Sequence, residues 1–200
     1  MRHTLGCALV AATLAGCGPG ESAVPESIDF LKVIQQFVAV DAVGITAMRN
    51  QGPGVLRAAR DFLCALDLSA VPTSSQQQYQ TWLDATTEAI LSSLPVRNRP
   101  WGTARKALNL FMRACVCDHH LRRAYNLDRI EQWAEIPVDG VVARALKKRA
   151  GRGALPRWQG LKHLKKADHQ PFQEFAIRYA RELGLPAPVY LDNYLWFINR

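Results

Sequence analysis

Apolar residues recur at intervals of three and four positions in every long segment of this chain, and this spacing limits the fold more than any other feature. In the segment 25–48, for example, Phe30, Val33, Ile34 and Phe37 would share one face of a helix. Few stretches alternate apolar with polar residues, which is the pattern of a half-buried strand. The sequence therefore predicts an all-α fold.

Clusters of proline and glycine divide the chain into helical segments. The expected helices span residues 25–48, 55–68, 76–94, 101–125, 127–135, a segment that starts near 140, 168–183 and 191–200. Two hundred residues with 48% hydrophobic content can bury an ample core. We expect residues 25–200 to form the helical domain.

The first 24 residues support two hypotheses. Met1-Arg2-His3 is a short basic start, and the apolar run that follows is too short to span a membrane as a helix. Leu14-Ala15-Gly16-Cys17 is typical of a bacterial lipoprotein signal. Either the chain is a membrane-anchored lipoprotein with a lipidated Cys17, or it is cytoplasmic and its start only mimics such a signal or truly begins near Val24.

A basic run between residues 140 and 167 carries the whole positive excess of the chain. It contains nine basic and no acidic residues, whereas the complete chain has a net charge of +8. Such a run favours a polyanionic partner, and its place directly after Asp139 predicts that it follows DNA phosphates. A solvated helix face is the alternative. Arg157 apart, the expected phosphate contacts are Arg144, Lys147, Lys148, Arg149, Arg152, Lys162, Lys165 and Lys166.

The five cysteines predict neither a disulfide framework nor an iron–sulfur cluster, because their spacing fits neither. Cys115 and His119 would share a helix face, but tetrahedral zinc needs four converging ligands, usually from two segments. We therefore expect no metal and no other cofactor.

Lys106 is a candidate for chemistry with an ordinary alternative. In the expected helix 101–125 it lies opposite the apolar face, on the same side as Leu110 and Arg113. The apolar face consists of Ala104, Ala107, Leu108, Phe111 and Cys115. On an isolated helix Lys106 would face water, so it can be a nucleophile only if a second lobe covers that side.

Asp139 and the C-terminal segment supply the other candidates. Asp139 follows Pro137 and is placed to cap the helix that starts near Gly140. Asp192 and Trp196 are four residues apart, so they would share a face of the last helix. A capping aspartate and a half-buried tryptophan are the ordinary explanations for these residues.

The order of these residues resembles that of the helix-hairpin-helix DNA glycosylase superfamily, and most of all its archaeal GO glycosylase (AGOG) branch. There, too, a lysine lies in a helix well upstream of a Pro-Val-Asp segment; here 33 residues separate Lys106 from Asp139. That branch also has an Asp-x-x-x-Trp pair in its C-terminal helix, like Asp192 and Trp196. The resemblance covers roughly residues 100 to 200, and the chain lacks the Gly-rich hairpin of the better-known branches.

The resemblance implies a two-lobed helical fold with the active site in the cleft. It also implies a bifunctional DNA glycosylase with AP lyase activity that removes an oxidised purine such as 8-oxoguanine. Lys106, deprotonated by desolvation and by Asp139, would attack the sugar C1′ and form a Schiff base. Asp139 would also stabilise the positive charge that develops on the sugar.

The implied base pocket consists of Asp192, Trp196 and a glutamine from the N-terminal helix, namely Gln36 or its neighbour Gln35. A base inside duplex DNA must be flipped out to reach such a pocket. The expected partner is double-stranded DNA with a damaged base, bound by a monomer in the cytoplasm, at the nucleoid.

Two rival hypotheses stand beside this one. The first is a non-catalytic helical DNA-binding protein of the same fold, which would bind DNA without forming an adduct at Lys106. The second is a lipid-anchored envelope protein whose basic run meets anionic lipid or polysaccharide.

Overall fold

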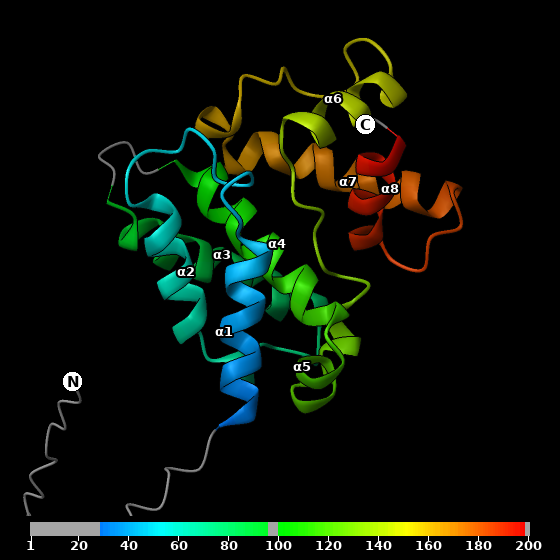
Figure 1. Cartoon of the computed structure of the whole chain (residues 1–200). Helices are drawn as coiled ribbons and strands as arrows, with labels where there is room; N and C mark the ends of the chain where they lie inside the picture. The colour runs from blue at the N-terminus through cyan, green and yellow to red at the C-terminus, as the bar shows by residue number, and fades with distance from the viewer. Residues whose placement is uncertain (1–28, 96–99, 199–200) are drawn as a thin grey trace, which may run out of the picture.

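The computed structural model describes residues 29–95 and 100–198, and every regular element within them is a helix (Figure 1). This confirms the all-α prediction. The signal-like segment with Cys17 lies outside the described residues. The helices are α1 (Phe30–Ala42), α2 (Val55–Ala65), α3 (Gln76–Ser93), α4 (Trp101–Cys117), α5 (His119–Ala124), α6 (Gly140–Ala150), α7 (Lys166–Glu182) and α8 (Leu191–Ile198). Short 3-10 turns lie at Leu68–Ala70, Leu127–Ile130, Leu161–His163 and Pro188–Tyr190.

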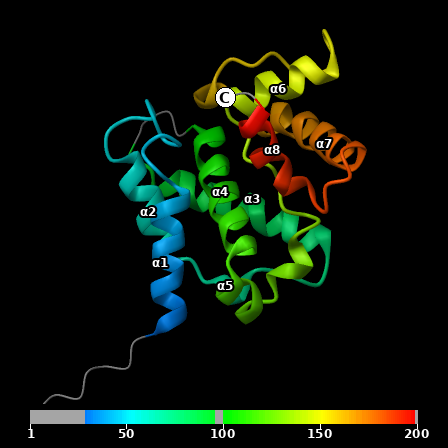
Figure 2. The same cartoon turned by 45° about the vertical axis from the view of Figure 1, so that its right-hand side comes forward.

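The buried apolar side chains form two large clusters. The first belongs to α1 to α5 and the turns between them, with Tyr79 and Phe111 among its largest members. The second belongs to residues 136–195, with Phe172 as its largest fully buried side chain. Helix α4 runs through the middle of the molecule, with α1 and α2 on one side and α6 to α8 toward the other (Figure 2). It packs on α1, α2 and α3 and also on α7 and the 161–163 turn.

Helix α4 is therefore buried on nearly all sides, which the sequence pattern did not predict. The expected apolar face is buried, and so is every other residue from Gly102 to Met112. Lys106 is only 7% exposed, because the segments around residues 47 and 139 cover the side that would face water on an isolated helix. The side of α4 that carries Lys106 is therefore covered.

Four expected helix boundaries were wrong; the expected helix 55–68, for one, ends at Ala65. The expected helix 101–125 ends at Cys117, because the Asp118 carboxylate accepts hydrogen bonds from two backbone amides and starts α5. The expected helix 127–135 is only the short turn Leu127–Ile130. Helix α1 ends at Ala42 and not near Met48, and the Arg60 side chain donates to carbonyl oxygens at its end. Residues 43–50 therefore form turns and irregular backbone instead of helix.

No helix in the ranges 29–95 and 100–198 is both long enough and apolar enough to cross a membrane.

Candidate active site

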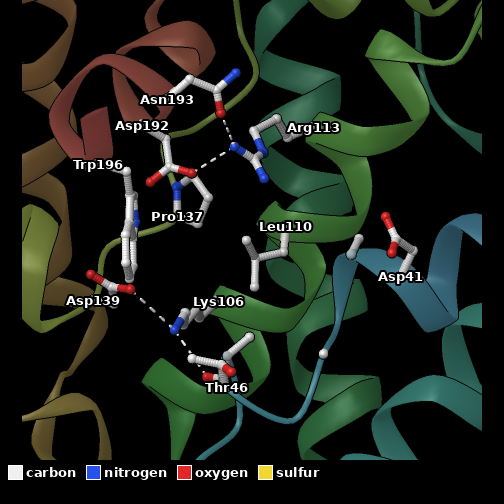
Figure 3. Close-up of a pocket in the computed structure, with 13 residues that line it drawn as sticks. Asp41, Thr46, Lys106, Leu110, Arg113, Pro137, Asp139, Asp192, Asn193 and Trp196 are labelled. Atoms are coloured by element: carbon white, nitrogen blue, oxygen red, sulfur yellow. Dashed lines mark hydrogen bonds and ion pairs between the residues drawn. The ribbon is translucent and has the colours of Figure 1, made fainter. Parts of the chain in front are cut away.

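A pocket of about 410 Å³ opens where α4 meets the 41–47 segment, the 137–139 segment and α8 (Figure 3). Its size lies within the usual range for small-ligand sites. Its walls come from both sides of α4, so residues far apart in sequence share one cavity. The lining residues are Asp41, Ala42, Gly44, Thr46, Ala47, Lys106, Leu110, Arg113, Pro137, Asp139, Asp192, Asn193 and Trp196.

Lys106 reaches the pocket from α4 and is held by two acceptors. Its Nζ donates to the carbonyl oxygen of Ala47 at 2.9 Å and lies 3.3 Å from Oδ2 of Asp139. Both side chains are largely buried. Shielding from water is one way in which a lysine is activated as a nucleophile, whereas a neighbouring carboxylate stabilises the charged form of the amine and can accept its proton.

Asp139 performs two tasks with its two carboxylate oxygens. Oδ1 accepts hydrogen bonds from the backbone amides of Val141 and Val142, at 2.9 and 3.0 Å, and so caps α6. Oδ2 faces Lys106. The expected cap is therefore present, and it fixes the direction of the other oxygen. The N-terminus of α6 therefore holds the Asp139 carboxylate in one orientation.

Asp192 and Trp196 reach the pocket from α8, as their spacing on one face predicted. The Trp196 side chain is 38% exposed and forms part of the wall. Asp192 is buried, and its Oδ2 accepts a hydrogen bond from Arg113 Nη1 at 2.7 Å. Burial raises the pKa of Asp192 to about 6; the Arg113 charge opposes this shift, the Asp139 charge adds to it, and the Lys106 charge lowers it.

The expected pocket glutamine was placed wrongly. Gln36 is exposed on α1 and does not line the pocket. Gln35 is buried, but its side-chain amide donates to the carbonyl oxygens of Leu63 and Leu66 and ties α1 to the end of α2. The N-terminal part of the chain contributes residues 41–47 to the pocket instead. No periodic pattern in the sequence marked this irregular segment.

The basic run lies outside the pocket, and part of it is already paired. Lys147 donates to two carbonyl oxygens of the loop that follows α6, each at 2.9 Å. Arg149 pairs with Glu182 at 3.2 Å, and Lys166 pairs with Asp84 at 2.6 Å. The remaining expected phosphate contacts are exposed: Arg144, Lys148, Arg152, Lys162 and Lys165.

A buried polar network that the sequence did not reveal positions the segment leading to Asp139. Arg105 donates through two nitrogens to the two carboxylate oxygens of Glu135, at 2.8 and 2.9 Å. The Gln173 side chain bonds both the amide and the carbonyl of Ile136. The residues just before Asp139 are therefore fixed against α4 and α7. The only sequence signal was a charged residue, Arg105, beside an apolar face.

Arg113 is a further functional candidate that the sequence did not single out. It lies on the Lys106 side of α4 and pairs with Asp192 across the pocket.

Among the described residues, no group of three or more His, Cys, Asp or Glu side chains is placed to hold a metal ion.

Comparison of the chain with models of protein families, with curated proteins and with solved structures finds no match. Function therefore has to be inferred from the pocket. Its side chains offer a shielded amine, a fixed carboxylate, an aromatic wall and a buried acceptor. That set can hold a flat, hydrogen-bonding ligand against a nucleophile.

Proposed function

We propose that this chain is a DNA glycosylase with AP lyase activity, which removes an oxidised purine such as 8-oxoguanine from double-stranded DNA. The observation that carries the proposal is the approach of the Lys106 amine to the Asp139 carboxylate, 3.3 Å apart, in a pocket that Trp196 also lines. Two separate core clusters, whose chain segments both contribute lining residues to this pocket, support the two-lobed, glycosylase-like arrangement that the sequence resemblance implies.

In the proposed reaction the damaged base leaves the DNA stack and enters the pocket. Trp196 stacks on its face, and Asp192 accepts hydrogen bonds from its edge. Lys106 first gives up its proton to Asp139, and the neutral amine attacks C1′ of the sugar. The bond between C1′ and the base nitrogen breaks; its electron pair leaves with the base, which takes the proton from Asp139 and so restores the carboxylate.

The covalent intermediate then opens its sugar ring and becomes a Schiff base at Lys106. This imine makes the neighbouring C2′ proton acidic, and its loss expels the 3′ phosphate by β-elimination. Asp139 stabilises the positive charge that builds on the sugar before the new bond is complete. Because Oδ1 of Asp139 is fixed by the start of α6, Oδ2 keeps its position during this step.

The charge of the pocket favours a base over a phosphate as the ligand inside it. Its lining contains three carboxylates, from Asp41, Asp139 and Asp192, against two cations, from Lys106 and Arg113. A phosphate would be repelled by the acidic excess, whereas a neutral ring with N–H donors would not. The exposed part of the basic run lies outside the pocket, where the DNA backbone would be.

The test is borohydride trapping of the Schiff base on duplex DNA that contains 8-oxoguanine. The unmodified chain is expected to form a covalent adduct, Lys106→Gln to form none, and Asp139→Asn to form it much more slowly. Lys32→Gln, which removes a lysine of α1 outside the pocket, is the matched control and is expected to behave like the unmodified chain. An adduct that persists in Lys106→Gln contradicts the assignment. DNA binding without any adduct favours a non-catalytic DNA-binding protein.

A DNA substrate also implies that the protein works in the cytoplasm, at the nucleoid. The mass of the mature N-terminus tests this part separately. A chain cleaved before Cys17 and lipidated there would instead favour the membrane-anchored envelope protein.

A further inference from the structure

Arg113 lies seven residues after Lys106 on α4, and both face the same pocket. Two helical turns separate positions seven residues apart, so the two side chains lie on one face of the helix. The guanidinium reaches across to α8, where its Nη1 donates to Oδ2 of Asp192 at 2.7 Å and to Oδ1 of Asn193. Figure 3 shows this fork of contacts at the opposite end of the pocket from Lys106. One helix thus holds both the amine and the group that fixes the far wall.

We propose that Arg113 is the positioning residue for base recognition: it holds Asp192 in place as an ionised acceptor, so that the pocket selects a purine whose edge donates hydrogen bonds. This inference rests on the proposed glycosylase function. The hydrogen bond from Arg113 goes to Oδ2, which leaves Oδ1 available to a ligand. A carboxylate fixed through one oxygen offers the other at a defined place, and an ionised oxygen accepts stronger hydrogen bonds than a neutral one.

Asp192 needs such a partner because its surroundings disfavour its charge. It is buried, and the Asp139 carboxylate from the 137–139 segment repels it. Arg113 and Lys106, both from α4, are the cations that act against this. With all four groups present, the pKa of Asp192 is about 6. Loss of the Arg113 charge removes the stronger of the two opposing cations, so the pKa of Asp192 rises further and less of it is ionised near neutral pH.

If Arg113 serves base recognition, its loss should affect two assays differently, although both depend on Lys106. Excision of 8-oxoguanine from duplex DNA needs both base recognition and the amine. Borohydride trapping on duplex DNA with a ready-made abasic site needs the amine but has no base to recognise. In Arg113→Gln the ratio of the excision rate to the trapping rate is expected to fall about tenfold or more, the usual effect of losing a hydrogen bond to a charged group. Arg113→Lys, which keeps the charge, is expected to recover part of the ratio.

The pH profile gives a second readout that a purely structural role would not move. Single-turnover excision by the unmodified chain is expected to fall as the pH drops through about 6, because Asp192 then takes up a proton. In Arg113→Gln this acidic limb is expected to lie at higher pH. The matched control is Arg122→Gln, which breaks a comparable ion pair, 2.7 Å to Glu131, outside the pocket. It is expected to leave both the ratio and the limb in place.

The result that overturns the inference is a ratio and an acidic limb in Arg113→Gln equal to those of the control, or excision and trapping that fall together by the same factor. Thermal unfolding of each variant shows whether a joint fall reflects lost fold, and in that case Arg113→Lys decides: a folded Arg113→Lys in which excision and trapping still fall by the same factor is evidence against the assignment. A failure of the proposed function is different. The unmodified chain would then form no adduct with abasic DNA at all, and the role of Arg113 would be rejected with it.

Discussion

Replacing Glu135 by Gln is expected to destabilise the protein more than any surface substitution. Glu135 and Arg105 are buried, with side chains 5% and 3% exposed, and two hydrogen bonds of 2.8 and 2.9 Å join them. Asn109 donates a further bond to Glu135 at 2.9 Å. Arg105 also donates to Thr87 at 2.9 Å and lies 3.1 Å from Asp84.

The magnitude follows from what the substitution leaves behind. Without the Glu135 charge, the counter-ion left to the buried guanidinium within residues 29–95 and 100–198 is the partly exposed Asp84. Removing one partner of a buried ion pair costs about 3–5 kcal/mol, because the other charge stays desolvated. Replacing both partners removes that penalty. The double variant Arg105→Met, Glu135→Gln is therefore expected to cost at least ~1 kcal/mol less than the sum of the two single variants.

The assay is urea unfolding followed by far-ultraviolet circular dichroism, with the free energy of unfolding extrapolated to water. Glu182→Gln is the matched control, because the Arg149–Glu182 pair is exposed, and it is expected to cost no more than about 1 kcal/mol. A cost for Glu135→Gln as small as that of the control would refute the reasoning. Strict additivity of Arg105→Met and Glu135→Gln would refute it as well, since it would mean that the two groups do not stabilise each other.

Two further predictions concern the basic run and the packing of α4. The salt dependence of DNA affinity is measured for Lys148→Gln and Lys165→Gln. Each variant is expected to lower the slope of log K against log salt by about 0.9 for every phosphate that it no longer neutralises. A slope that is unchanged, like that of the control Arg57→Gln on α2, would mean that the run is a solvated face. Gly102→Ala is expected to destabilise by ~1–3 kcal/mol in the same urea assay, because the new Cβ would lie 2.5 Å from a carbonyl oxygen of the turn before α7. Gly44→Ala, whose Cβ would meet its nearest atom at 3.7 Å, is the control and should change stability by no more than about 0.5 kcal/mol.

The local sequence pattern was enough to predict the helices and some of their ends. Apolar spacing depends only on neighbours along one helix, so it predicted an all-α chain and the buried face of α4. The cap at Asp139 was also predictable, because a capping carboxylate bonds amides two and three residues away. Asp192 and Trp196 share a face for the same local reason.

The site itself depends on which distant segments cover α4, and periodicity contains no information about that. Lys106 looks like a surface residue on its own helix and is buried only because the segments around residues 47 and 139 close over it. Gln36 was assigned to the pocket from its place in the N-terminal helix, but the rotation of that helix leaves it exposed. The pairs Arg105–Glu135 and Arg113–Asp192 join residues 30 and 79 positions apart. A buried charge is tolerated only where such a partner arrives, and only the tertiary structure decides where that is.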